Sequence, residues 1–142
     1  MNAHVAVLMG GWSAEREVSL TSGRTCALAL RGAGYRVTEI DVDETLTHRL
    51  SGLKPDVVFN ALHGRWGEDG CVQGLLELLR LPYTHSGVRA SAIAMHKPSS
   101  LEMFRAHGIP CAESCLTTPA AVNAKDPMDR PYVVKPSAEG ST

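Results

Sequence analysis

The sequence predicts an α/β fold with an open, mostly parallel sheet that has helices on its faces. Residues 5–9, VAVLM, are a continuous apolar run that ends at Gly10 and Gly11, and such a run is typical of a strand covered on both faces. Further strands are expected at residues 35–42 and 55–62. Strands that alternate with helices at this spacing favour parallel pairing through right-handed crossovers.

Helices are expected between these strands and after the third one. A helical period runs from Ser13 to Gly32, and residues 43–53 offer a second, short helix. Three more segments complete this part of the chain: a helix at 71–81, a brief strand at 82–86 and a small-residue helix at 87–96. Ligands of such sheets bind at the carboxyl ends of the strands, so the loops at residues 10–17 and 63–70 form the candidate site.

The last third of the chain changes in character and indicates the start of a second unit. Residues 97–110 predict a helix closed by a glycine and a proline, and strands are expected at 111–118 and 132–135. We therefore expect a first domain over residues 1–95 and the beginning of a second over 96–142, which ends in the flexible loop SAEGST.

Composition and charge exclude several classes of function. The 142 residues are 44% hydrophobic and 20% charged, with 14 Lys and Arg against 15 Asp and Glu. There is no basic run, so the electrostatic footprint of a nucleic-acid binder is missing. No apolar stretch approaches the ~20 residues that cross a bilayer, and the N-terminus lacks a signal-peptide pattern. We expect a cytoplasmic protein without membrane insertion.

The four cysteines, Cys26, Cys71, Cys111 and Cys115, show no disulfide framework, and we expect reduced thiols. Cys111 and Cys115 lie near His107 in a C-x3-C pattern, but a structural zinc site needs four ligands. Buried or half-buried thiols are the favoured interpretation, so no metal site is predicted in this chain.

The loop after the first predicted strand, GGWSAEREVSL, combines a glycine turn with acidic residues. Such a turn usually receives phosphate, yet the G-x-G-x-x-G fingerprint fails here, and Glu15 and Glu17 follow the glycines. Two carboxylates would repel a pyrophosphate and attract an ammonium. The alternative is structural: Ser13 caps the helix and the acidic residues offset its dipole, at roughly 0.3–1 kcal/mol each.

The second loop, HGRWGEDG, favours a binding function for both loops. His63 stands where a buried strand ends, and Gly64, Gly67 and Gly70 let the backbone approach a ligand. Because both loops leave the carboxyl ends of parallel strands, Glu15 and His63 are expected on the same side of the sheet.

Two lysines are candidates for phosphate contacts. Lys135 closes the predicted strand YVVK and precedes a proline and a loop that contains glycine and serine. A lysine beside a flexible loop is suited to clamp a phosphate. Lys97, at the start of the preceding helix, is the second candidate, although an exposed lysine is more often a solvated charge.

Three segments resemble the N-terminal part of the D-alanyl-D-alanine ligase family, ATP-grasp enzymes of peptidoglycan synthesis. They are GGWSAEREVSLTSG, ALHGRWGEDGCVQGLLELLRLPYTHSGVRASAIAMHK and YVVKPSAEGST, and they occur in the family's order across nearly all of the chain. The resemblance implies a Rossmann-like pre-ATP-grasp domain, followed by the incomplete start of an ATP-grasp central domain. It also implies a role in cell wall biogenesis and cell shape.

For the reaction, the resemblance implies that ATP phosphorylates the carboxylate of one D-alanine and that the amine of a second D-alanine attacks the acyl phosphate. Glu15 would hold the ammonium of the first D-alanine, with Val18 lining the site and His63 near the carboxylate. Ser141 would join a hydrogen-bonded group with Glu15 at the substrate, so these two are the implied catalytic residues.

The resemblance places ATP at the other end of the site. Lys97 and Lys135 would contact the ATP phosphates, and the loop that begins at Gly140 would close over them. Mg2+ is implied as a cofactor, with its ligands in sequence beyond this chain. The family usually has MDK at Lys97, whereas this chain has MHK followed by Pro98, so the family's orientation of Lys97 does not carry over directly.

The resemblance covers only part of the family's machinery. The magnesium carboxylates, an arginine at the reacting groups and the oxyanion-hole glycine belong to sequence beyond Thr142, so the chain is expected to be a fragment that is inactive alone. Two alternatives stay open: a stand-alone amino-acid-binding or interaction module, and a ligase that uses D-lactate as second substrate. D-alanine and ATP are the expected partners, and relatives are commonly homodimers.

Overall fold

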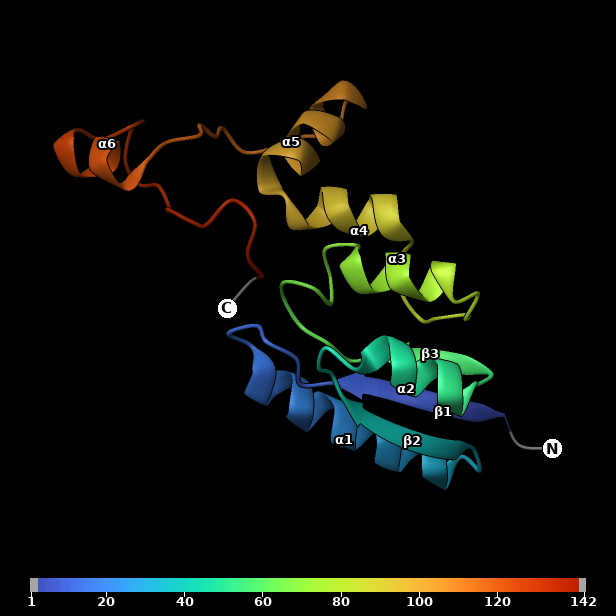
Figure 1. Ribbon diagram of the computed structural model, residues 1–142. Coiled ribbons are helices and arrows are strands. Elements are labelled where there is room, and N and C mark those ends of the chain that lie inside the picture. Colours follow the sequence, from blue (N-terminus) through green and yellow to red (C-terminus); the bar gives the residue numbers. More distant parts are fainter. Residues whose placement is uncertain (1–2, 141–142) are drawn as a thin grey trace.

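The computed structural model describes residues 3–140 and has an α/β architecture (Figure 1). The strands are β1 (His4–Met9), β2 (Arg36–Asp41) and β3 (Val57–Asn60). The helices are α1 (Arg16–Gly32), α2 (Leu46–Leu53), α3 (Cys71–Leu78), α4 (Val88–Met95), α5 (Lys97–Ala106) and α6 (Pro119–Ala124). The strands form a parallel sheet in the order β2-β1-β3. The predicted fold class, a parallel sheet flanked by helices, is confirmed.

Strand β1 is the centre of the sheet because its side chains can be buried on both faces. All six of its residues are buried, and it pairs with β2 over its whole length and with β3 over four residues. Ala6 and Leu8 pack with residues of α2 and α3, whereas Val5 and Val7 pack with α1. Figure 1 shows α1 on one side of the sheet and α2 and α3 on the other. One strand therefore supplies two cores, as its alternating side chains require.

Helices α1 to α5 follow the predicted periods, with small differences at their ends, whereas α6 was not predicted. Helix α3 ends at Leu78, three residues before the predicted end, because Arg80 takes a positive φ of 55° that a helix does not allow. None of the helices within residues 3–140 is long and apolar enough to span a bilayer.

Three strands expected after α3 are corrected by the structure. The strand predicted at 82–86 is reduced to a bridge between Tyr83 and Val58, and residues 111–118 and 132–135 form no strand. A strand needs a neighbour that completes its backbone hydrogen bonds. Within residues 3–140, neither of the last two segments has such a neighbour, and both valines of the second segment are exposed.

The chain beyond α4 lies outside the two cores of the sheet. Neither α5 nor α6 contains a buried residue. After α6 the chain runs back in an extended form (Figure 1), and residues 137–140 return to the loop that follows β1. This return matters for the site, because it brings Gly140 beside Glu15.

Helix α1 approaches the sheet closely at Gly23. A Cβ atom on Gly23 would lie 2.5 Å from Met9 Cβ, so Met9 would have to move. We expect Gly23→Ala to lower the free energy of unfolding by about 1–3 kcal/mol, because crowding against β1 outweighs the gain in helix propensity. Denaturant unfolding of the variant measures the loss.

The matched control for this variant is Gly32→Ala. Gly32 is the last residue of the same helix, and a Cβ there would meet no atom within 4 Å. We expect no loss of stability for the control, since only helix propensity changes. Equal stability losses in the two variants would contradict a close approach specific to Gly23.

Candidate functional site

The two glycine-containing loops begin side by side at the carboxyl edge of the sheet. One leaves β1 at Gly10, the other leaves β3 at Ala61, and the fully buried Ser19 of α1 connects them. Ser19 Oγ accepts a hydrogen bond from the Gly10 N–H at 2.9 Å and donates one to the Ala61 carbonyl at 2.8 Å. This contact agrees with the expectation that the topology brings both loops to one edge of the sheet.

Further contacts join the tips of the loops. Ser13 Oγ donates to the His63 carbonyl at 2.8 Å, and Trp12 and Trp66 meet edge to face with ring centroids 6.4 Å apart. Ser13 was predicted as the helix cap, and this is wrong: α1 begins at Arg16, after Glu15. The Ser13 hydroxyl accepts the Glu15 N–H at 3.2 Å within the turn before the helix.

Glu15 is half-buried between two glycines from distant parts of the chain. A Cβ on Gly64 or on Gly140 would collide with Glu15 Oε2, so a side chain at either position would displace the Glu15 carboxylate. Gly64 also has a positive φ of 68°, which favours glycine. Within residues 3–140, Glu15 forms no ion pair. The site therefore presents a carboxylate without a counter-charge among the described residues.

The other residues predicted around Glu15 lie on α1 and on the loop that follows β3. His63 is half-buried, and its Nε2 lies 3.2 Å from Ser22 Oγ of α1. Val18 is on the first turn of α1 and is 51% exposed, so its side chain is available at the loop. Glu17 is exposed in the same turn, where a carboxylate is favourable to the helix dipole.

The second loop is ordered by its own acidic residues and by buried amides. Glu68 accepts the Gly64 N–H at 2.5 Å, and Asp69 accepts the N–H groups of Trp66 and Cys71 at 3.0 and 3.1 Å. The Gly67 carbonyl receives 2.8 Å hydrogen bonds from two buried side chains, those of Asn60 and Gln73. These acidic side chains are used by the loop itself, in contrast to Glu15.

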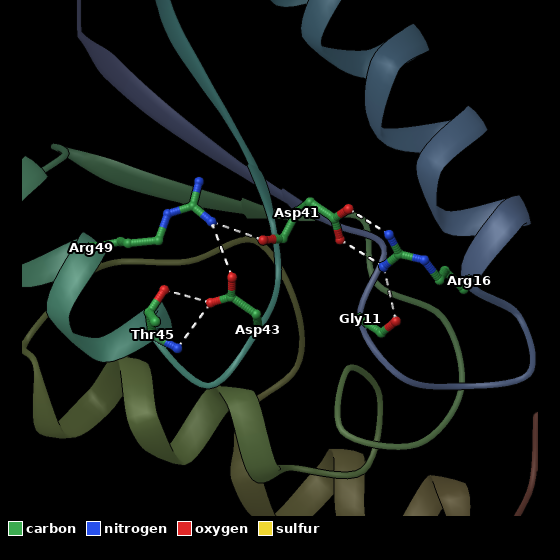
Figure 2. Close-up of polar contacts among 6 residues, drawn as sticks. All are labelled: Gly11, Arg16, Asp41, Asp43, Thr45 and Arg49. Atoms are coloured by element: carbon green, nitrogen blue, oxygen red, sulfur yellow. Dashed lines mark hydrogen bonds and ion pairs between the residues drawn. The ribbon is translucent and has the colours of Figure 1, made fainter.

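Arg16 and Asp41 form a bidentate ion pair beneath the first loop (Figure 2). Arg16 Nη1 donates to Asp41 Oδ1 at 2.7 Å, Nη2 donates to Oδ2 at 2.5 Å, and Nη1 also donates to the Gly11 carbonyl at 3.1 Å. The hydrogen bonds from Arg16 hold the pKa of Asp41 below its ordinary value and raise that of Arg16. A charged clamp thus connects α1, β2 and the glycine turn.

Asp41 is itself fixed by α2, as Figure 2 also shows. Arg49 Nη1 donates to the Asp41 carbonyl at 2.9 Å and lies 3.9 Å from Asp43 Oδ2. Asp43 accepts the hydroxyl and the N–H of Thr45 at 2.5 and 2.9 Å, and these bonds lower the pKa of Asp43. These contacts with α2 therefore hold the carboxyl end of β2 in place.

Lys97 faces the returning chain, and the MHK departure has a structural explanation. The Lys97 Nζ donates to the Glu139 carbonyl at 2.7 Å, and its N–H donates to the Ser137 carbonyl at 2.8 Å. His96 takes the N-cap position of α5, where its ring accepts the Ser99 N–H, and Pro98 occupies the first turn. Proline is favourable there because the first N–H groups of a helix have no partner within it.

A hollow of about 410 Å3 lies between the second loop, α4 and the returning chain. Lys97, Gly140 and Glu68 line it from three directions. Lys135 is exposed on the extended segment, and in the described residues it forms no ion pair. The predicted residue Ser141 lies outside the described residues.

The C-x3-C pattern is not assembled into a ligand set. Cys111 Sγ lies 3.4 Å from the Ile109 carbonyl, and Cys115 Sγ lies 3.9 Å from the Pro127 carbonyl. Among residues 3–140, no group of three His, Cys, Asp or Glu side chains could hold a metal ion, so these residues do not fit a magnesium site.

Sequence reasoning missed Ser19, Arg16 and Asp41. Two signals could have found them. One is a serine on the helix face that packs on the sheet, and the other is an aspartate that ends a strand next to a glycine turn. Neither signal shows which partner the side chain meets, because that depends on how the strands are aligned in the sheet.

These features define a class of protein: a parallel α/β domain, a fold whose ligands usually bind at the carboxyl edge of the sheet. A family model described as the N-terminus of D-ala D-ala ligase matches residues 46–86. The D-alanine--D-alanine ligase of Parvibaculum lavamentivorans is 64% identical over 139 residues, covering 98% of this chain and 45% of that protein. The ligase of Ruegeria pomeroyi is also 64% identical, covering 99% of this chain and 46% of that protein.

A solved structure agrees with these relatives. The D-alanine--D-alanine ligase from Bacillus anthracis complexed with ATP matches with a TM-score of 0.78 at 31% identity, covering 96% of this chain and 48% of that chain. The chain therefore belongs to the D-alanine--D-alanine ligase family and corresponds to the N-terminal part of its members. It spans about half the length of the curated relatives it matches.

The lowered pKa of Asp41 makes its contribution to stability depend on pH. Such a carboxyl stabilises the fold above its unfolded pKa of about 3.9, and the contribution is lost as the pH falls through the lower folded pKa. We expect Asp41→Asn to be less stable than wild type at neutral pH, with a difference that shrinks to nothing in acid. Urea unfolding at a series of pH values measures it, and a difference that is independent of pH would contradict the prediction.

Proposed function

We propose that the protein containing this chain is an ATP-dependent ligase that joins two D-alanine molecules into D-alanyl-D-alanine. The observation that carries the proposal is the Glu15 carboxylate, which lies between Gly64 and Gly140 and has no ion-pair partner within residues 3–140. A partly buried anion is stabilised by a cation that can also donate hydrogen bonds, and the ammonium of an amino acid meets both needs.

In the proposed reaction, the γ-phosphoryl group of ATP passes to the carboxylate of the first D-alanine, giving an acyl phosphate and ADP. The amine of the second D-alanine then attacks the acyl carbon, loses a proton and displaces phosphate. Glu15 would orient the first D-alanine through its ammonium, with Ser141 in the same hydrogen-bonded group. His63 would stand near the substrate carboxylate, and Val18 would line the site.

The phosphate end of the site would be formed by Lys97, Lys135 and the loop at Gly140. Lys97 supports this assignment, because a main-chain carbonyl holds its Nζ and so leaves the positive charge without a counter-charge. Cations and backbone N–H groups suit a transferring phosphoryl group, and a glycine loop can close over it. Mg2+ would be held by residues other than those described.

The proposal includes a division of the chain into a substrate domain at 1–95 and the start of a central domain at 96–142. It is supported by the start of α5 at Lys97 and by the absence of buried residues in α5 and α6. We also propose that the protein containing this chain is a cytoplasmic, homodimeric enzyme of cell wall biogenesis.

The ammonium assignment is tested with Glu15→Gln in the full-length enzyme. We expect the KM for the first D-alanine to rise by about 10–100-fold, because a hydrogen bond to a charged partner is worth ~1.5–3 kcal/mol. The KM for ATP should stay nearly constant. Steady-state kinetics with each substrate varied in turn measures both values.

Glu17→Gln is the matched control, since Glu17 is an exposed carboxylate on the first turn of the same helix. It should leave both KM values unchanged. Unchanged D-alanine kinetics in Glu15→Gln would remove the assignment of Glu15.

The phosphate assignment is tested with Lys135→Ala in the same enzyme. Loss of a charged contact to ATP should raise the KM for ATP by about tenfold or more and leave that for D-alanine unaffected. Lys125→Ala is the control, because Lys125 is an exposed lysine at the end of α6. If only the D-alanine dependence moved, the phosphate role of Lys135 would be wrong.

A further inference from the structure

The glycine turn that presents Glu15 rests directly on the ion pair of Arg16 and Asp41. Gly10 and Gly11 both have positive φ, at 74° and 77°. A Cβ on Gly10 would collide with Asp41 Oδ1 and lie 2.8 Å from Arg16 Nη1. The backbone of the turn is therefore in van der Waals contact with the charged pair, and its shape depends on where that pair sits.

The pair is anchored on the sheet side and reaches the loop on the other side. Asp41 lies opposite Met9 in the sheet, and Arg49 holds its carbonyl. Arg16 spans from this anchor to the Gly11 carbonyl, so the aspartate, the guanidinium and the turn form one connected unit. A planar guanidinium held by two parallel hydrogen bonds has a defined orientation.

Arg16 is also the neighbour of Glu15 in the chain, and a guanidinium is a strong ligand for a carboxylate. The Glu15 carboxylate has no ion-pair partner within residues 3–140, whereas Arg16 is paired with Asp41. An arginine released from Asp41 would compete with a substrate ammonium for the same oxygens.

We propose that Asp41 and Arg16 are positioning residues for the amino-acid site: their ion pair fixes the glycine turn that presents Glu15 and keeps the Arg16 guanidinium away from the Glu15 carboxylate. The proposal rests on the proposed function, in which Glu15 binds the ammonium of the first D-alanine. Asp41 would act through Glu15 and would not contact the substrate itself.

The test is Asp41→Asn in the full-length enzyme, which retains the shape of the side chain and removes its charge. We expect the KM for the first D-alanine to rise by about tenfold, because residues in one charged network are typically coupled by this amount. The KM for ATP should stay unchanged. In a Glu15→Gln background the same substitution should have almost no further effect on D-alanine use, since the group through which Asp41 acts is gone.

The matched control is Glu39→Gln. Glu39 pairs with Arg31 at 2.6 Å and so joins the same two elements, α1 and β2, at the last turn of α1. Removing that pair should leave both KM values unchanged. Equal KM changes in Asp41→Asn and Glu39→Gln would show a general effect on α1 packing and overturn the proposal.

The double variant separates the two hypotheses. If Glu15→Gln alone changes D-alanine use but Asp41→Asn does not, the positioning role fails while the proposed function stands. An Asp41→Asn effect that persists undiminished in the Glu15→Gln background would also overturn the positioning role. If Glu15→Gln alone leaves D-alanine use unchanged, the ammonium assignment fails and the positioning role with it.

Discussion

The site depends on one buried hydroxyl, that of Ser19. Where β1 and β3 end, the sheet ladder stops and leaves the Gly10 N–H and the Ala61 carbonyl without strand partners. Ser19 Oγ satisfies both groups at once, from a helix that is packed on the sheet. An unsatisfied buried polar group costs about 1–3 kcal/mol, so both loops are held to the spacing at which this hydroxyl reaches them. The contact between Glu15 and Gly64 follows from that spacing, because each lies a few residues beyond the joined ends.

Much of the fold could be predicted, because its strongest signal is local. The apolar run of β1 puts apolar side chains on both faces of the strand. Such a strand must be covered on both sides, so a central parallel strand with helices on either face of the sheet could be predicted. The strands at 111–118 and 132–135 were predicted from the same kind of local pattern and are wrong. Backbone pairing decides whether an extended segment becomes a strand, and alternating side chains do not supply a partner.

The candidate site, like the fold, could be predicted only in part. Topology placed Glu15 and His63 at one edge, and the structure brings their loops together. The clamp of Arg16 and Asp41 could not be predicted, because 25 residues separate them and their meeting depends on the alignment of Asp41 with Met9 across the sheet. The role of His96 in MHK is seen only in the structure: its ring nitrogen caps α5, and Lys97 points toward the returning chain.

The charged residues of the site differ in whether a partner within the protein already neutralises them. Arg16, Glu68 and Asp69 are held by partners within the protein, so they shape the loops and offer little to a ligand. Glu15 has no ion-pair partner within residues 3–140, and among the described residues Lys97 Nζ bonds a carbonyl and forms no ion pair, so both charges are open to a ligand. Charges that are already paired in the free protein contribute little net attraction to a ligand, whereas open ones contribute most. This distribution of charge is the reason for proposing that the glycine turn, which resembles a phosphate loop, binds an amine and that Lys97, which lines the hollow, contacts phosphate.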